Sequence, residues 1–123
     1  MPKVLIVDDE KHIRLLYAEE LEEEGYDVAL ASDGAEILDL IEKEKPDVII
    51  LDIKMVSSNG LDVLQDVRNK FYNLPVILCS AYGSYKVDVK SIAADAYVVK
   101  SSDLTELKKK IAQVLETSVP MKD

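Results

Sequence analysis

Acidic residues directly follow two of the most apolar segments of the chain. Asp8 and Asp9 come after residues 4–7, and Asp52 comes after residues 48–51. Carboxylates packed together in a low-dielectric site repel one another strongly. A hard divalent cation such as Mg²⁺ removes that repulsion, and a carboxylate can attack phosphorus to form an acyl phosphate. The pattern therefore indicates metal-assisted phosphoryl chemistry, provided that the two segments lie side by side.

Two further polar residues follow apolar segments in the same way. Ser80 comes after residues 76–79, and Lys100 comes after residues 96–99. A hydroxyl and an ammonium group are suited to stabilise charge on the oxygens of a transferring phosphoryl group. Each residue alone has an ordinary explanation; acidic residues at 8–10, for example, favour the positive end of a following helix. Their recurrence at the ends of four apolar segments favours a shared site.

The apolar segments have the composition of buried strands. Three of them are rich in Val and Ile without alternation, which is typical of strands covered on both faces of a parallel sheet. The strand candidates are residues 4–7, 27–30, 48–51, 76–79 and 96–99, and helical patterns cover residues 11–24, 35–44, 61–70 and the segment that begins with the capping box Asp103-Leu104-Thr105-Glu106. Alternating strands and helices predict an α/β fold with right-handed crossovers, in which the carboxyl ends of the strands share one edge.

The composition excludes several classes of protein. The chain has 123 residues, 48% of them hydrophobic, and 24 acidic against 15 basic residues give a net charge of −9. We therefore expect a single folded domain without direct contacts to nucleic acid or membrane. One cysteine, Cys79, and one histidine, His12, exclude an intrachain disulfide and the usual Cys/His zinc site. No apolar run has the length of a signal peptide or a membrane span, so we expect a soluble cytoplasmic protein.

The motifs, taken in order, resemble those of the receiver domains of two-component response regulators. The matching segments are Ile6-Val7-Asp8-Asp9-Glu10, Asp33-Gly34, Pro46-Asp47, Leu51-Asp52-Ile53-Lys54-Met55, Asn59-Gly60, Ser80-Ala81-Tyr82-Gly83 and Ala94-Asp95-Ala96-Tyr97-Val98-Val99-Lys100. The resemblance implies the flavodoxin-like receiver fold, a doubly wound five-stranded parallel sheet of order 2-1-3-4-5 with five flanking helices. The expected boundaries are 1–118 for the receiver domain and 119–123 for a short C-terminal tail.

The resemblance also implies how the site would handle a phosphoryl group. Asp52 would be the phosphorylation site, and Lys100 would pair with the phosphoryl oxygens. Ser80 would donate a hydrogen bond to one of those oxygens. The backbone of Ile53 and Ala81 would contact the phosphoryl group as well.

A metal site is implied beside the phosphorylation site. The expected ion is Mg²⁺, with Mn²⁺ as an alternative. Asp9, Asp52 and the backbone carbonyl of Lys54 would bind it directly, and Asp8 would act largely through water. Lys54 and Tyr82 would flank the approach of water to the acyl phosphate and so slow its hydrolysis. The only reactions expected of the domain are its own phosphorylation and this slow dephosphorylation.

The function implied is that of a phosphoacceptor in a two-component system or phosphorelay. The donor would be a sensor histidine kinase or a histidine phosphotransfer protein. Ser80 and Tyr97 would act as the switch that changes the face formed by the fourth helix, fifth strand and fifth helix, and a downstream effector protein would bind that face. The domain would be a monomer or a weak phosphorylation-dependent dimer, and it would stand alone or belong to a larger regulator.

Three features depart from the usual family pattern. Val56 and Ser101 stand where most relatives have proline, and the twenty positions from Ser80 to Lys100 make a shorter segment than is common. A cis peptide bond is far more costly before serine than before proline. We therefore predict a trans bond between Lys100 and Ser101.

Three other functions are compatible with parts of the pattern. A receiver-like domain that no longer takes phosphate would bind partners only, although the full acidic set argues against it. A hydrolase of the aspartyl-phosphate type would have a second acid where this chain has Lys54. A flavodoxin-like binder of nucleotides or flavins would require a phosphate-binding loop after the first strand. At that position this chain has Asp8, Asp9 and Glu10, which would repel a phosphate.

Overall fold

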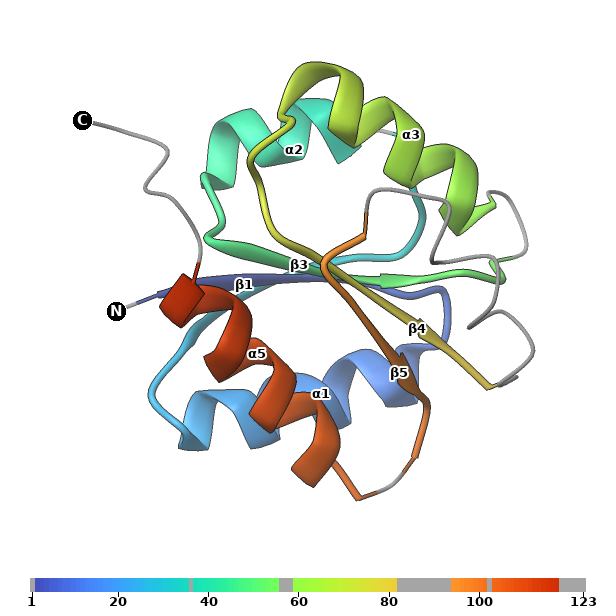
Figure 1. Ribbon diagram of the computed structural model, residues 1–123. Helices are drawn as coiled ribbons and strands as arrows, with labels where there is room; N and C mark the ends of the chain where they lie inside the picture. The colour runs from blue at the N-terminus through green and yellow to red at the C-terminus, as the bar shows by residue number, and fades with distance from the viewer. Residues whose placement is uncertain (1, 36, 56–58, 82–93, 102, 118–123) are drawn as a thin grey trace.

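Five parallel strands form one sheet in the order β2-β1-β3-β4-β5 (Figure 1). The computed structural model describes residues 2–35, 37–55, 59–81, 94–101 and 103–117. The strands are β1 (Lys3–Val7), β2 (Asp27–Ala31), β3 (Val48–Asp52), β4 (Val76–Ser80) and β5 (Ala96–Val99), and the helices are α1 (Lys11–Glu23), α2 (Ile37–Glu44), α3 (Gly60–Lys70) and α5 (Thr105–Thr117). The predicted parallel α/β fold and strand order are confirmed. The expected fourth helix falls within residues 82–93, outside the described residues.

Two hydrophobic cores cover the two faces of the sheet. Helices α2 and α3 lie over one face, and α1 and α5 lie over the other (Figure 1). Successive side chains of β3 alternate between these cores, with Ile50 on the α1/α5 face and Leu51 on the α2/α3 face. Every residue of β3 and β4 is buried, because both strands are central and covered on both sides. Within the described residues, no helix has the length and apolar character needed to cross a membrane.

Asn59 and Gly60 bring the start of α3 against the end of β3. The Asn59 Oδ1 accepts a hydrogen bond from the Leu61 amide at 2.8 Å, which caps the helix. The Gly60 amide donates to the Ile53 carbonyl at 2.7 Å. A Cβ atom at Gly60 would lie 2.2 Å from the Asp52 carbonyl oxygen and 2.6 Å from the Ile53 Cα. Glycine is therefore required for the close approach that fixes the chain after Asp52.

The start of α5 differs from the predicted capping box. The helix begins at Thr105, whose amide and hydroxyl both donate to the Asp103 Oδ1, at 3.0 and 2.6 Å. The Asp103 amide donates to the Ser101 hydroxyl at 3.0 Å instead of to Glu106. The peptide bond between Lys100 and Ser101 is trans, as predicted. Ser101 thus anchors the turn that follows Lys100 through a hydrogen bond.

Replacing Gly60 by alanine is expected to destabilise the protein by about 2–3 kcal/mol, because the new methyl group meets backbone atoms that cannot move aside. Urea unfolding followed by circular dichroism measures the change. The matched control is Asn69→Ala, at an exposed position of the same helix, which should stay within about 0.5 kcal/mol of wild type. Equal stability of Gly60→Ala and wild type would show that the close approach of α3 to β3 is relaxed at no cost.

Candidate acidic metal and phosphoryl site

The carboxyl ends of β1 and β3 bring three carboxylates together. Asp8 directly follows β1 and Asp52 ends β3, and the two strands are neighbours whose register pairs Val7 with Leu51. One carboxylate oxygen from each of Asp8, Asp9 and Asp52 lies within 4.8 Å of the other two. The side chains of Asp8 and Asp52 are buried, at 4% and 2% exposure. The strand ends therefore create a compact acidic cluster, formed by Asp8, Asp9 and Asp52.

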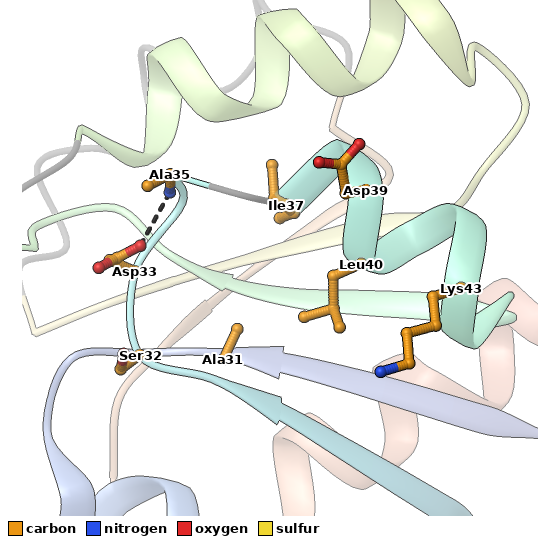
Figure 2. Close-up of a pocket in the computed structure, with 8 residues that line it drawn as sticks. All are labelled: Ala31, Ser32, Asp33, Ala35, Ile37, Asp39, Leu40 and Lys43. Carbon is orange, nitrogen blue, oxygen red and sulfur yellow. Dashed lines mark hydrogen bonds between the residues drawn. The ribbon is translucent and has the colours of Figure 1, made fainter.

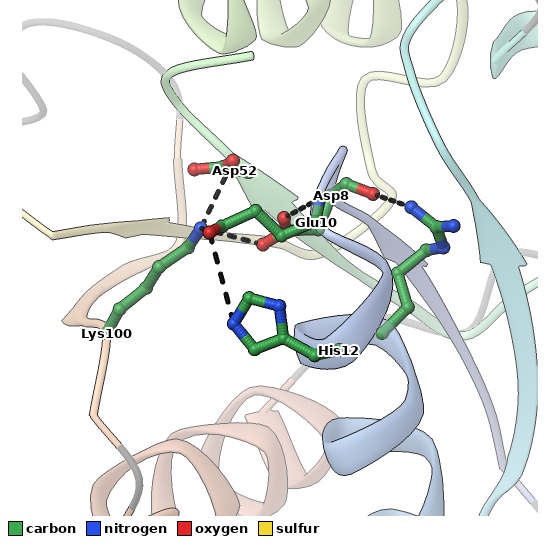
Figure 3. Close-up of polar contacts among 6 residues, drawn as sticks. Asp8, Glu10, His12, Asp52 and Lys100 are labelled. Carbon is green, nitrogen blue, oxygen red and sulfur yellow. Dashed lines mark hydrogen bonds and ion pairs between the residues drawn. The ribbon is translucent and has the colours of Figure 1, made fainter.

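The Lys100 ammonium group lies against this acidic cluster. Its Nζ is 2.8 Å from the Asp8 Oδ2, 3.2 Å from the Asp52 Oδ2 and 3.2 Å from the Glu10 Oε1 (Figure 3). The Lys100 side chain is only 12% exposed. Its backbone amide donates to the Ser80 carbonyl at 2.7 Å, which ties the start of the β5–α5 connection to the end of β4. A cation directly after β5 thus neutralises part of the charge that lies at the ends of β1 and β3.

Asp8 is held in place by three neighbours. Its Oδ1 accepts the Glu10 amide at 2.9 Å, and its Oδ2 faces Lys100 (Figure 3). Its backbone carbonyl accepts the Arg14 Nη1 at 2.7 Å. From the sequence, Glu10 is expected only to favour the positive end of the helix, and the contact of Arg14 is not predicted. Both residues follow Asp8 closely in the sequence, and this proximity is the sequence feature that could have indicated their contacts with Asp8. His12, which Figure 3 also shows, has a side chain that is 76% exposed.

Two of the predicted switch and phosphoryl residues lie on one face of the sheet. Ser80 ends β4 and is buried, and it follows Cys79, which is the register partner of Asp52. Tyr97 on β5 is 9% exposed and belongs to the core on the α2/α3 face. Alternation along β4, in which Cys79 faces α1 and α5, places Ser80 on the α2/α3 face as well. Ser80 and Tyr97 are therefore positioned on a common side.

The other predicted residues occupy the loops beyond the strands. Lys54 is exposed and forms an antiparallel bridge with Asn59, and Ala81 is exposed directly after β4. The Ile53 amide donates to the Cys79 carbonyl at 2.9 Å. A contact of this amide with a phosphoryl oxygen would therefore require it to exchange or share its present acceptor.

Asp52 is electrostatically disfavoured as an anion. Burial, followed by the charge of Asp8, raises its pKa from 3.8 to about 6, although Lys100 acts in the opposite direction. Its Oδ2 accepts no hydrogen bond from any residue that the structure describes. The Lys100 contact at 3.2 Å is thus an ion pair without hydrogen-bond geometry. The pKa of Lys100 is raised overall: burial lowers it, but the hydrogen bond to Asp8 and the charges of Asp52 and Asp8 outweigh burial.

The acidic cluster fits a hard divalent cation. Its donors are carboxylate oxygens, which suit Mg²⁺, and the buried Asp52 Oδ2 has unused acceptor capacity. Both oxygens of Asp8 are already engaged, by the Glu10 amide and by Lys100. Asp52 is therefore a better candidate for direct coordination than Asp8, whose engaged oxygens suit an indirect role.

A pocket of about 420 Å³ lies elsewhere, between the end of β2 and α2 (Figure 2). Asp33, Asp39 and Lys43 supply its charged lining. The Asp33 Oδ1 accepts the Ala35 amide at 2.8 Å and so belongs to the turn before α2. Asp39 and Lys43 are exposed residues of the helix surface. The pocket lacks the buried, mutually close charges of the acidic cluster, which is the stronger candidate for chemistry.

Asp52→Asn is expected to stabilise the protein without metal at pH 7 by up to about 3 kcal/mol. The folded pKa of Asp52, about 6, lies above its ordinary value of 3.8, so wild type loses stability as the pH rises between these values. Above about pH 6 wild type shows the full destabilisation, and near pH 4 the free energies of unfolding of wild type and Asp52→Asn become similar. Urea unfolding with a chelator at both pH values measures this. Exposed Asp66→Asn is the control, and a difference for Asp52→Asn that does not change with pH would contradict the argument.

Comparisons with known proteins agree with this geometry. The family profile described as response regulator receiver domain matches residues 4–112. The response regulator protein TrrA of Thermotoga maritima, solved in complex with Mg²⁺-BeF, is 44% identical; the match covers 93% of this chain and 99% of that one, with a TM-score of 0.87. A complex of the histidine kinase ThkA with TrrA matches at 44% identity and a TM-score of 0.86, covering 94% and 99% of the two chains.

A third solved structure extends the likeness beyond one organism. The receiver domain of the Francisella response regulator 1452 is 33% identical, with a TM-score of 0.85, and the match covers 94% of this chain and 98% of that one. The family match spans both the acidic cluster and Lys100. The chain therefore belongs to the response regulator receiver domains, the phosphoacceptor domains of two-component signalling.

Proposed function

We propose that Asp52 accepts a phosphoryl group from a phosphohistidine of a sensor histidine kinase or a histidine phosphotransfer protein. The observation that carries this proposal is the buried Asp52 carboxylate, which has an unused acceptor oxygen and lies beside two more carboxylates and the Lys100 ammonium group. TrrA, solved with Mg²⁺-BeF and with a histidine kinase, supports the same assignment by similarity.

The chemistry at Asp52 is a phosphoryl transfer without redox change. A carboxylate oxygen forms a bond to phosphorus while the phosphorus–nitrogen bond of the donor breaks, and the imidazole leaves with the electron pair. With a pKa of about 6, most Asp52 side chains are ionised and nucleophilic at neutral pH. Lys100, held 3.2 Å from the Asp52 Oδ2, is placed to pair with the phosphoryl oxygens. Ser80 supplies a hydroxyl at the neighbouring strand end.

Asp9, Asp52 and the Lys54 backbone carbonyl would hold Mg²⁺, or Mn²⁺ in its place, with Asp8 acting through water. The ion, when bound, supplies positive charge that offsets the carboxylates and the phosphoryl oxygens. Asp8 is suited to its indirect role because Lys100 and the Glu10 amide already occupy its two oxygens.

The proposed switch couples the site to the β5 side of the molecule. Ser80 is buried on the face that also holds Tyr97, and its carbonyl binds the amide of Lys100. A phosphoryl group that attracts the Ser80 hydroxyl would therefore alter the packing beside Tyr97. We propose that the face expected from the fourth helix, which lies outside the described residues, together with β5 and α5 changes with it and controls the binding of an effector protein.

The setting proposed for this switch is the cytoplasm. A net charge of −9 disfavours direct binding to nucleic acid or to anionic membranes, so the output is a protein contact. The domain works as a monomer or as a weak dimer that forms on phosphorylation. The only reactions proposed for it are its own phosphorylation and a slow dephosphorylation.

Asp52→Asn is expected to abolish phosphoryl uptake, because the amide is nearly isosteric but is not a nucleophile toward phosphorus. Incubation with acetyl phosphate and Mg²⁺, followed by intact mass spectrometry, measures the uptake. Wild type and the exposed control Asp66→Asn should each gain one phosphoryl group, and a chelator should prevent this. Full labelling of Asp52→Asn would refute the assignment, and absence of labelling in wild type would instead favour a receiver-like domain that only binds partners.

Lys54 and Tyr82 are expected to slow the loss of the phosphoryl group by shielding it from water. Lys54 is exposed two positions after Asp52, and Tyr82 lies outside the described residues. Replacing both by alanine should speed the decay of the phosphorylated protein several-fold. The decay is followed by intact mass after removal of the donor, with Lys70→Ala as a control at an exposed lysine remote in sequence. An unchanged lifetime in the double variant would show that Lys54 and Tyr82 do not shield the acyl phosphate from water.

A further inference from the structure

Glu10 makes a side-chain contact to the proposed site that its place at the start of α1 does not require. It is the N-cap residue of α1, yet its side chain makes no capping hydrogen bond. Its Oε1 instead accepts a hydrogen bond from the Lys100 Nζ at 3.2 Å. Its other oxygen lies 4.0 Å from the His12 Nε2 (Figure 3). The carboxylate therefore extends across the site toward Lys100.

Lys100 is shared among three carboxylates in this arrangement. An ammonium group carries three N–H donors. Three carboxylates lie within 3.2 Å of its nitrogen, those of Asp8, Glu10 and Asp52. Phosphorylation replaces the single negative charge of the Asp52 carboxylate with roughly two charges on a group that has three acceptor oxygens. To pair with more than one of those oxygens, Lys100 must give up a present contact with Asp8 or Glu10.

Glu10 is the contact that can be given up at the lowest cost. Asp8 is 4% exposed, so breaking its pair with Lys100 would leave a buried charge without its partner. The Glu10 side chain is 50% exposed, so water replaces Lys100 at its carboxylate. Exposed ion pairs contribute little, which makes this contact suited to a modest control of rate rather than to holding the fold together.

We propose that Glu10 is a positioning residue that holds Lys100 in its resting arrangement and thereby slows phosphorylation of Asp52. The inference rests on the proposed function. In the reaction with acetyl phosphate, an Asp52 oxygen bonds to phosphorus, the bond from phosphorus to the acetate oxygen breaks, and acetate leaves as an anion. Lys100 must turn from Glu10 to the phosphoryl oxygens as this occurs.

The test compares three variants of α1 at saturating Mg²⁺, with acetyl phosphate as the donor and intact mass as the readout. Glu10→Gln keeps the shape but removes the charge, and it should raise the rate constant of phosphorylation about threefold. Glu10→Asp keeps the charge but is shorter, and aspartate at an N-cap turns to the helix amides. It should also accelerate the reaction. Glu19→Gln, an exposed control with the same charge change, should match wild type.

The salt dependence of the rate provides a second readout that a purely structural role of Glu10 would not change. Salt screens an exposed ion pair, so the advantage of Glu10→Gln over wild type should shrink as ionic strength rises.

Each alternative result overturns a defined part of the proposal. Equal rates for Glu10→Gln and wild type would overturn the restraint by Glu10 while leaving the proposed function intact. Equal acceleration by Glu10→Gln and Glu19→Gln, with an unchanged rate for Glu10→Asp, would show a general effect of net charge. That result would also overturn the restraint by Glu10. No labelling of wild type would overturn the proposed function and the inference together.

Discussion

The ion pairs of Lys100 with the buried carboxylates of Asp8 and Asp52 are the interaction on which the arrangement of the site depends. Without the ammonium group, two nearly inaccessible carboxylates would face each other at the ends of β1 and β3. The Coulomb repulsion and the loss of hydration would both oppose folding. Even with Lys100 in place, the pKa of Asp52 is raised to about 6, so Lys100 does not fully offset the burial and the repulsion by Asp8. That residual imbalance is what favours a cation at this edge.

The sheet order explains how one lysine can reach both carboxylates. β5 is separated from β3 by β4, so the Lys100 side chain must pass the end of β4. The residue at that end is small Ser80, and its carbonyl fixes the Lys100 amide at 2.7 Å. Just beyond β3, Gly60 allows α3 to approach the Asp52 carbonyl. Small residues beside Asp52 therefore leave room for the chain to converge on it.

The sequence predicted the elements and the strand-end residues, because buried strands and β-α alternation leave strong patterns. The order of the strands followed only from the family resemblance. The contacts of Glu10 and Arg14 could not be predicted, since they depend on how α1 is set against β1 and β5. The capping box at Asp103 was wrong because Ser101 supplies a competing acceptor for the Asp103 amide. The acceptor of the Ile53 amide was missed because it comes from the neighbouring strand.

The most direct measurement for this account is thermal unfolding with increasing Mg²⁺ in wild type and Asp9→Asn. Wild type should melt at a temperature that rises with the logarithm of Mg²⁺ concentration, because the ion binds only the folded acidic cluster. Asp9→Asn should melt higher than wild type without metal, since repulsion is reduced, and should respond little to Mg²⁺. An equal rise with Mg²⁺ in both proteins, together with equal melting temperatures without metal, would contradict the claim that unbalanced carboxylate charge defines the site.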